Sequence, residues 1–341
     1  MFDILSADRE ALTALTAALG EKKFRAEQLF RWLHVQCVST YDEMGNLPQE
    51  FRRKLAEEAP LRRAAIETVQ ESRLDGTRKY LFRLADDSFI ESVLMRYEYG
   101  ISVCVSSQVG CRMGCRFCAS TLDGLSRNLT AGEILDQVEQ ISRDTGERVS
   151  HVVVMGTGEP FDNYDSLVRF IRLLTDEKGQ NLSQRNITVS TCGIVPRIYQ
   201  FAKEGLAVNL ALSLHAPNDE MRRELMPIAN RYSLDEILPA MKAYFAATGR
   251  RLTYEYSLCK GVNDGDEAAE ALGRLLRGQN ALVNLIPVNP VTERGFVDPS
   301  GSETALFKKK LEKNGLHVTI RREMGRDIDG ACGQLRKRFM T

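Results

Sequence analysis

Residues 111–118 read Cys-Arg-Met-Gly-Cys-Arg-Phe-Cys, and the rest of the chain is best understood outward from this stretch. It places Cys111, Cys115 and Cys118 in the spacing C-x3-C-x2-C. Three thiolates at this spacing can bind three irons of a cubane [4Fe-4S] cluster and leave the fourth iron without a protein ligand. A small molecule with an amine and a carboxylate can chelate that open iron. The stretch therefore predicts a [4Fe-4S] cluster that binds a second cofactor.

The alternative for the same three cysteines is a structural zinc site. Structural zinc takes four ligands, usually from two C-x2-C or similar pairs. No second pair of this kind follows in the sequence, because the downstream cysteines stand singly. The spacing favours the iron–sulfur cluster, and a zinc-stabilised protein without catalysis stays open as a second interpretation.

Composition limits the class of protein. The chain has 341 residues and equal numbers of basic and acidic side chains, 46 of each, so a nucleic-acid site would have to be a local patch. No apolar run reaches the roughly 20 residues that cross a bilayer. The first residues lack the basic and apolar regions of a secretory signal. Eight cysteines without such a signal predict a reducing, cytoplasmic environment and no membrane association.

The N-terminal 60 residues have the apolar spacing of short helices and carry many Lys and Arg side chains. These cations are either the solvated faces of the helices or an RNA-docking surface, and the sequence leaves both open. Residues 64–105 alternate between apolar and polar positions in places, which predicts strands at 80–84, 88–94 and 101–105.

From residue 101 onward, strand-like and helix-like segments alternate. This rhythm predicts an α/β fold with a parallel sheet and helical crossovers. About six βα units fit into the chain, fewer than the eight of a closed barrel, so we expect an open, partial TIM-like barrel. In such folds the chemistry lies at the C-terminal ends of the strands. The expected strands are 101–106, 151–155, 186–190, 207–213, 252–258, 281–286 and 316–320.

Polar residues follow several of these strands. The segment Gly156-Thr157-Gly158-Glu159-Pro160 follows one strand, but it is a weak nucleotide motif because it lacks the last glycine of G-x-G-x-x-G. One polar residue at a strand end is usually a cap or a turn residue. Several that converge on one edge of a sheet favour a cofactor cleft. The others are Ser190, Ser213 and His215 around Leu214, and Asn289.

Near the C-terminus, Cys332 lies between small residues, with Gly330 and Gly333 close by. Such a cysteine is either a close-packed core thiol or an accessible nucleophile, and the residues alone do not decide between them.

Together these segments resemble the radical S-adenosylmethionine (SAM) adenine-C2 RNA methylases, and the resemblance runs nearly end to end. Two departures leave target choice open: Thr157 stands where the family often has Met, and residues 323–326 are not its commonest lead-in. The resemblance is carried by FRAEQLFRW (24–32), MGNLP (44–48), CVSSQVGC (104–111), the three-cysteine stretch, the Gly-Glu segment and DIDGACGQL (327–335).

The resemblance implies a division of the chain into an N-terminal RNA-binding helical domain (1–62), a β-rich extension (63–96), a radical SAM core (97–327) and a methyl-carrier loop and tail (328–341). In the core, SAM would occupy the open iron and be cleaved to a 5'-deoxyadenosyl radical. The residues implied to hold SAM are Gly158, Glu159, Ser190, Ser213, Leu214, His215 and Asn289.

The resemblance also implies a two-SAM reaction at adenine C2. Cys332 would carry a methyl group, and Cys104 would attack the Cys332 sulfur to release the product. Glu91 would accept the C2 proton, although a solvent-facing strand carboxylate is the simpler interpretation of that residue. Cys37, Cys192 and Cys259 match no motif and are interpreted as packing residues.

The implied substrates are 23S ribosomal RNA near the peptidyl-transferase centre and tRNA beside the anticodon. An electron donor such as flavodoxin or ferredoxin is implied as well, and a monomer is expected. Two further alternatives stay open. One is the sister activity at adenine C8, which confers antibiotic resistance. The other is a radical SAM enzyme that acts on a protein or metabolite, which would not need the Cys104–Cys332 pair.

Overall fold

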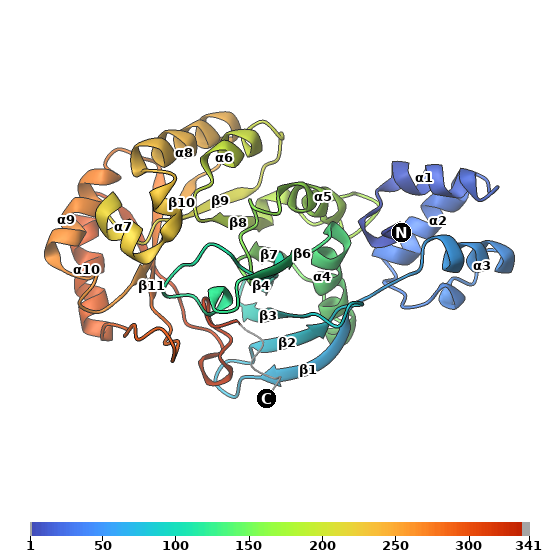
Figure 1. Ribbon diagram of the computed structural model, residues 1–341, viewed down its shortest axis with the longest axis horizontal. Coiled ribbons are helices and arrows are strands. Elements are labelled where there is room, and N and C mark those ends of the chain that lie inside the picture. Colours follow the sequence, from blue (N-terminus) through green and yellow to red (C-terminus); the bar gives the residue numbers. More distant parts are fainter. Residues whose placement is uncertain (1, 336–341) are drawn as a thin grey trace.

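The computed structural model describes residues 2–335 and is built on one large mixed sheet (Figure 1). Its ten strands follow the order β1-β2-β3-β4-β7-β8-β9-β10-β11-β12 within the described residues. From β4 onward every neighbouring pair in this sheet is parallel. The parallel strands are β4 (Gly100–Cys104), β7 (His151–Val154), β8 (Ile187–Thr191), β9 (Asn209–Ser213), β10 (Leu252–Leu258), β11 (Ala281–Pro287) and β12 (His317–Ile320).

Helices connect the parallel strands, so the chain between β4 and β12 forms six βα units and a final strand. The sheet is open, since β12 pairs only with β11 among the described residues. The predicted partial barrel is therefore confirmed. The connecting helices are α4 (Ala131–Thr145), α5 (Tyr164–Leu174), α6 (Val195–Phe201), α7 (Asp219–Leu225), α8 (Leu234–Thr248), α9 (Asp266–Leu275) and α10 (Gly301–Lys313).

Helix α4 shows how local sequence sets the first crossover. Thr130 caps its start, because its hydroxyl accepts from the Glu133 backbone N–H at 3.2 Å while Glu133 reaches back to the Thr130 N–H at 2.9 Å. Ile134, Val138 and Ile141 are buried on one face of the helix. Gly146 ends the helix in the left-handed region, at φ 67°. The cap sets the start of α4 directly after the cysteine loop, and the buried face packs the helix against the core.

An antiparallel extension lengthens the sheet on the far side of β4. It consists of β1 (Ala65–Glu71), β2 (Arg78–Arg83) and β3 (Phe89–Tyr97), and β3 pairs antiparallel with β4 so that Val93 lies opposite Cys104. Within the loop after β4, a small hairpin forms from β5 (Gln108–Gly110) and β6 (Leu125–Asn128).

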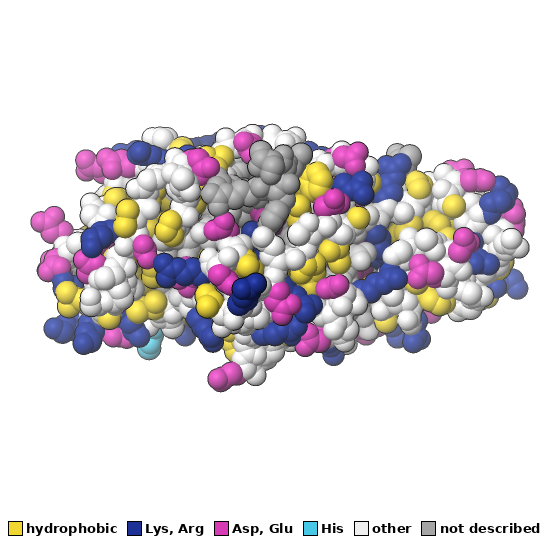
Figure 2. All heavy atoms as spheres, turned by 90° about the horizontal axis from the view of Figure 1, so that it is seen from below, with side chains coloured by type: hydrophobic (Ala, Val, Ile, Leu, Met, Phe, Trp, Pro, Cys, Tyr) yellow, Lys and Arg dark blue, Asp and Glu magenta, His cyan; other side chains and the backbone are white. Residues whose placement is uncertain are grey.

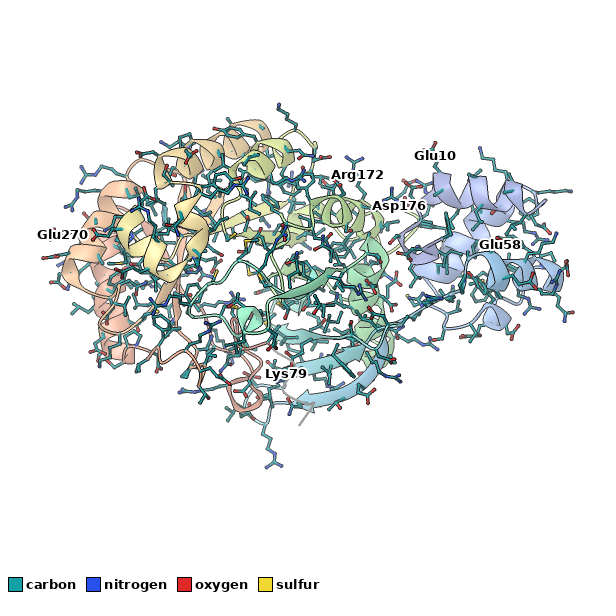
Figure 3. The ribbon with its side chains drawn as sticks, viewed as in Figure 1. Glu10, Glu58, Lys79, Arg172, Asp176 and Glu270 are labelled. Atoms are coloured by element: carbon teal, nitrogen blue, oxygen red, sulfur yellow. The ribbon has the colours of Figure 1, made fainter. Side chains whose placement is uncertain are left out.

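Three helices at the N-terminus form a module at one end of the molecule, beside α4 and α5 (Figure 1). They are α1 (Arg9–Ala18), α2 (Phe24–His34) and α3 (Gln49–Glu58). Figure 3 shows Asp176 on the side of the core that faces this module, where it accepts a hydrogen bond from Arg9 at 3.0 Å. Between residues 2 and 335 there is no helix whose length and apolar character would let it cross a membrane.

Candidate active site

A cavity opens at the C-terminal ends of the parallel strands, as the fold predicts. It encloses about 1000 Å³ free of protein atoms, including its opening to solvent. Most of the predicted site residues line it: Cys111, Cys115, Cys118, Gly158, Glu159, Ser190, Ser213, His215, Asn289 and Cys332.

The cysteine loop is held from several sides. The Cys111 N–H donates to the Gly124 carbonyl at 2.9 Å, which closes the β5–β6 hairpin. On the other side, the Arg116 N–H donates to the Leu225 carbonyl at the end of α7, also at 2.9 Å. Thr121 donates to the Cys115 and Cys118 carbonyls at 3.1 and 3.0 Å. These hydrogen bonds on several sides hold the cysteine loop in one conformation.

Arg294 adds a further clamp that the sequence did not indicate. It lies in the connection between β11 and α10 and donates to Thr121 Oγ1 at 2.6 Å and to the Cys118 carbonyl at 3.3 Å. No motif signals this role, since a single arginine in a loop usually faces solvent.

Of the three loop thiols, Cys111 is buried, and Cys115 and Cys118 are half-buried. Burial raises the pKa of Cys111 to about 12, and it also raises the pKa values of Cys115 and Cys118. Such thiols become thiolates when a metal binds them. Within residues 2–335, no three His, Cys, Asp or Glu side chains converge enough to hold a metal ion. Structural zinc needs four ligands on one ion, whereas a cubane takes one thiolate per iron. The donor set therefore fits the cluster better.

Glu159 is buried and oriented by three donors. Its carboxylate accepts from the Cys192 N–H at 2.8 Å, from Thr191 Oγ1 at 2.8 Å and from the Phe161 N–H at 3.0 Å. Burial raises the pKa of this carboxyl, and the hydrogen bonds oppose that effect. Each carboxylate oxygen has two lone pairs, so capacity remains for a cationic group in the cavity.

Gly158 lies beside Glu159 in a conformation that glycine alone adopts easily. Its φ is 113°, and a Cβ atom there would lie 2.7 Å from Ser107 Oγ and from Gln108 Cβ. Gln108 in turn accepts from the Glu159 N–H through its side chain at 2.8 Å. The Gly-Glu turn is thus locked against the first residues of the cysteine loop.

His215 is held as a neutral imidazole. Its Nδ1 accepts from the Ser257 N–H at 2.8 Å, and its φ of 56° lies in the left-handed region. Burial, followed by the charge of Arg222, lowers the pKa of His215 to about 3. The ring meets Phe117 of the cysteine loop edge-on, with 4.7 Å between ring centroids.

Two predicted cofactor residues are placed differently from the others. Leu214 does not line the cavity, because its side chain is fully buried and its backbone N–H and carbonyl bond to Glu255 and Arg222. Asn289 lines the cavity, but its amide donates to the Cys332 carbonyl at 2.9 Å. Asn289 therefore positions the C-terminal loop in this structure.

Cys332 is an exposed thiol, which excludes the close-packed core thiol that its sequence left open as one of two alternatives. It lies on the wall shared by the main cavity and a second cavity, which Cys104 lines from the end of β4. Burial raises the pKa of Cys104 to about 12, and the nearby Cys332 adds to the effect.

Arg321 opposes that rise, because its guanidinium lies close to both thiols and lines both cavities. Sequence reasoning did not place Arg321 at this site, although a charged residue directly after the last strand was an available signal.

Glu91 is buried, only 3% exposed, so the simpler interpretation of a solvent-facing carboxylate is wrong. Glu91 lies two residues before Val93 on β3, so the two side chains lie on the same face of the sheet. Val93 is the residue that pairs with Cys104 on β4. Glu91 lines a third, smaller cavity, and Leu335 lines that cavity as well as the other two.

Lys79, on the neighbouring strand β2, places its Nζ 3.7 Å from the Glu91 carboxylate. Figure 3 shows Lys79 on the extension of the sheet, beside the C-terminal loop. The sequence pattern failed for Glu91 because this part of the sheet is covered on both faces. Helix α4 contacts one face, where Ser92 bonds Gln137, and the cysteine loop and Leu335 line the cavity beside Glu91.

Comparison with known proteins agrees with the fold. Residues 105–272 match the radical SAM superfamily, and residues 2–61 match the ribosomal RNA large subunit methyltransferase N-terminal domain. A crystal structure of a radical SAM methyltransferase from Sphaerobacter thermophilus superposes with a TM-score of 0.95 at 44% identity, covering 98% of this chain and 99% of that one. The protein is thus a radical SAM methyltransferase.

Relatives with similar full-length sequences identify the family within this class of methyltransferases. A probable dual-specificity RNA methyltransferase RlmN from Lachnospira eligens is 57% identical over 100% of this chain and 97% of the relative. One of the same name from Clostridioides difficile is 50% identical over 97% and 96%. This chain belongs to the family of dual-specificity RNA methyltransferases. Membership implies SAM and a [4Fe-4S] cluster as cofactors and RNA as the substrate.

Proposed function

We propose that the protein methylates C2 of adenosine in RNA through a methyl group carried on Cys332. The observation that carries this proposal is the position of Cys332 on the wall between the two cavities. A methyl carrier must meet the cofactors on one side and a resolving thiol on the other. The same thiol is exposed, which a carrier requires and a packing cysteine does not.

The cluster and SAM, bound at the three loop thiols, would supply the methyl group and the one-electron chemistry that activates it. Glu159 and the turn at Gly158 would hold the amine of SAM, and Ser190, Ser213 and His215 line the same cavity. A carboxylate facing an ammonium makes a charge-assisted contact of this kind.

The remaining steps use three residues of the chain. Once the carbon on Cys332 is joined to adenine C2, Glu91 accepts the C2 proton, and the unpaired electron that radical addition leaves on the ring would return to the cluster. The Cys104 thiolate then attacks the Cys332 sulfur, which forms an S–S bond and breaks the S–C bond. The released electron pair takes up a proton on carbon and completes the methyl group. Reduction of the disulfide by an external thiol returns the enzyme to its starting state.

We infer that the RNA substrates are 23S ribosomal RNA near the peptidyl-transferase centre and tRNA beside the anticodon. The N-terminal domain match and the dual-specificity relatives support this assignment. The target base must be unstacked to enter the cavity. We assign RNA docking to residues 1–62 and electron delivery to a donor such as flavodoxin or ferredoxin.

Replacing each reactive cysteine tests the mechanism. Cys104→Ala should accumulate a covalent protein–RNA adduct, visible as a nuclease-sensitive upward shift on a denaturing gel, because the S–C bond cannot be opened. Cys332→Ala should form no adduct and no product. Cys37→Ala, which removes a thiol outside both cavities, should behave like the parent. Normal turnover by Cys104→Ala would exclude the resolving role.

The position of methylation separates the proposal from the C8 alternative. The reconstituted enzyme is incubated with RNA, and the digested nucleosides are compared with 2-methyladenosine and 8-methyladenosine standards by mass spectrometry. We expect only the 2-methyl product. Formation of 8-methyladenosine would assign the protein to the sister activity.

A further inference from the structure

Helix α7 buries a guanidinium that the methylation chemistry does not use. Arg222 is fully buried, yet it is bonded only to carbonyl groups. Its Nη2 donates to the Cys192 carbonyl at 2.6 Å and to the Ser213 carbonyl at 3.3 Å, and its Nε donates to the Leu214 carbonyl at 3.3 Å. These bonds tie α7 to the ends of β8 and β9.

No carboxylate balances this charge within the described chain. Arg222 takes part in no ion pair there, and its Nη1 is buried without a hydrogen-bond partner between residues 2 and 335. Asp219, on the same helix, influences it only from a distance. Glu159 directs its oxygens at Thr191 and the Cys192 N–H. A buried charge without a counterion is costly, so an anion is expected beside Arg222.

The cysteine loop is the neighbour that can supply this anion. Its middle packs on the segment that follows Arg222, where the Arg116 N–H donates to the Leu225 carbonyl and a Cβ on Gly114 would lie 3.3 Å from Pro227. Cys115 packs against the buried cluster of Cys192, Leu225 and Met226. Arg222 itself donates to the carbonyl of Cys192, a member of that cluster.

We propose that Arg222 is the buried counter-charge of the thiolate-bound iron–sulfur cluster and raises its reduction potential. Three thiolates outweigh a doubly positive [4Fe-4S] core by one negative charge, and one-electron reduction adds another. A fixed cation in a low-dielectric interior stabilises the reduced state more than the oxidised state. Charge and hydrogen bonding around the sulfurs are the protein's means of setting such potentials.

Arg222 therefore acts through the cluster and is a positioning residue. This role does not require the RNA chemistry proposed above, only the cluster that membership in the family implies. Its consequence is that the cluster becomes easier to reduce by a cytoplasmic electron donor.

The test compares two substitutions at this site with one control. Arg222→Lys keeps the charge, and Arg222→Gln keeps donor groups but removes it. Arg116→Gln makes the same charge change beside Cys115 at an exposed position, where water and salt screen it. Each protein is loaded with iron and sulfide anaerobically without SAM, and its iron content and reduction potential are measured by titration followed by electron paramagnetic resonance.

We expect a more negative potential for Arg222→Gln and near-parental potentials for Arg222→Lys and Arg116→Gln. Loss of the cluster in Arg222→Gln but not in Arg222→Lys would also support the proposal. A parental potential in Arg222→Gln, equal shifts in both variants or loss of the cluster in both would overturn it, since Arg222 would then be a structural clamp. A parent protein that binds no iron would instead refute the cluster assignment itself.

Discussion

At the scale of single residues, the cavity depends on groups kept in one ionisation state. His215 shows this most clearly, because its Nδ1 is already committed to the Ser257 N–H. Because the pKa of this imidazole is lowered, the folded protein leaves it neutral at pH values where the unfolded chain would protonate it. The pKa of about 3 in the folded protein lies below the unfolded value near 6.5.

The sign of the pH effect on stability follows from that difference. Between about pH 6.5 and 3 the unfolded state holds a proton on this group and the folded state does not. His215 should therefore lower the unfolding free energy by about 1.4 kcal/mol for each pH unit below 6.5. His215→Asn keeps an acceptor and tolerates the left-handed φ, so its denaturant midpoint should fall less steeply with acid. Equal acid slopes in both proteins would exclude this assignment.

Glu91 gives a second prediction at the residue scale, which depends on the proposed function. Glu91→Gln has almost the same shape but cannot accept the C2 proton. The variant should therefore stall after the carbon bond to adenine forms and accumulate the nuclease-sensitive adduct, with turnover reduced on the order of 100-fold or more. Parental turnover would show that Glu91 serves only as the partner of Lys79.

Prediction from sequence succeeded where a residue's place in the cavity followed from its position on the chain. Polar residues that end parallel strands must converge on one edge of the sheet, so Ser190, Ser213 and His215 could be found without a structure. Burial of Glu91 could not, because it depends on how β3 pairs with β2 and on a loop far away in the sequence. Arg222 carried no signal either, since an arginine on a short helix normally faces solvent.

At the scale of elements, the Gly-Glu turn after β7 packs against the start of the cysteine loop, although the two segments are separate in the sequence. Gly158 allows residues 106–108 to pack against it, and the Ser107 and Gln108 N–H groups both donate to the Thr157 carbonyl, at 2.9 and 3.1 Å. The cysteine loop and the Gly-Glu turn are therefore one rigid unit. Their coupling fixes the shape of this part of the cavity.

Gly158→Ala tests this coupling. The added Cβ meets Ser107 at a φ that L-residues avoid, so the variant should lose about 1–3 kcal/mol of stability. It should also bind SAM at least about tenfold more weakly in calorimetry on the iron-loaded protein. The control is Gly146→Ala at the end of α4, where φ is also positive but no atom lies within 4 Å of the new Cβ. Parental SAM affinity in Gly158→Ala would contradict the coupling.

At the scale of the whole molecule, a buried charge network fastens the N-terminal module to α4. His34 bonds Glu139 at 2.9 Å, Arg63 bonds Glu139 at 2.7 Å, and Arg63 also pairs with Asp136. All four side chains are at most 5% exposed. Removing the module at residue 60 would break this network, so truncation is a poor way to isolate its role in RNA binding.

The network itself predicts a large effect on stability. Arg63→Met leaves two buried carboxylates without their shared cation, and removing one partner of a buried pair typically costs about 3–5 kcal/mol. Denaturant unfolding of the variant should show this loss. Arg53→Met, which breaks only exposed pairs with Glu50 and Glu57, should change stability little. Equal effects of the two substitutions would mean that the network does not fasten the module.

RNA binding by the module is better tested on its surface. Figure 2 shows basic side chains scattered among acidic ones, including at the end of the molecule where the module lies, so the cations without acidic partners matter most. Lys22, Lys23 and Arg31 are exposed and take part in no ion pair within the described chain.

Replacing these three residues with Gln should weaken RNA binding and lower the slope of log K against log salt by about 0.7–0.9 for each phosphate that the variant no longer neutralises. SAM cleavage in the absence of RNA should stay at the parental rate, because none of the three lines the cavity. Arg53→Gln is the control, since that cation is already balanced by Glu50 and Glu57. An unchanged slope in the triple variant would move the RNA surface away from these helices and toward the cavity mouth.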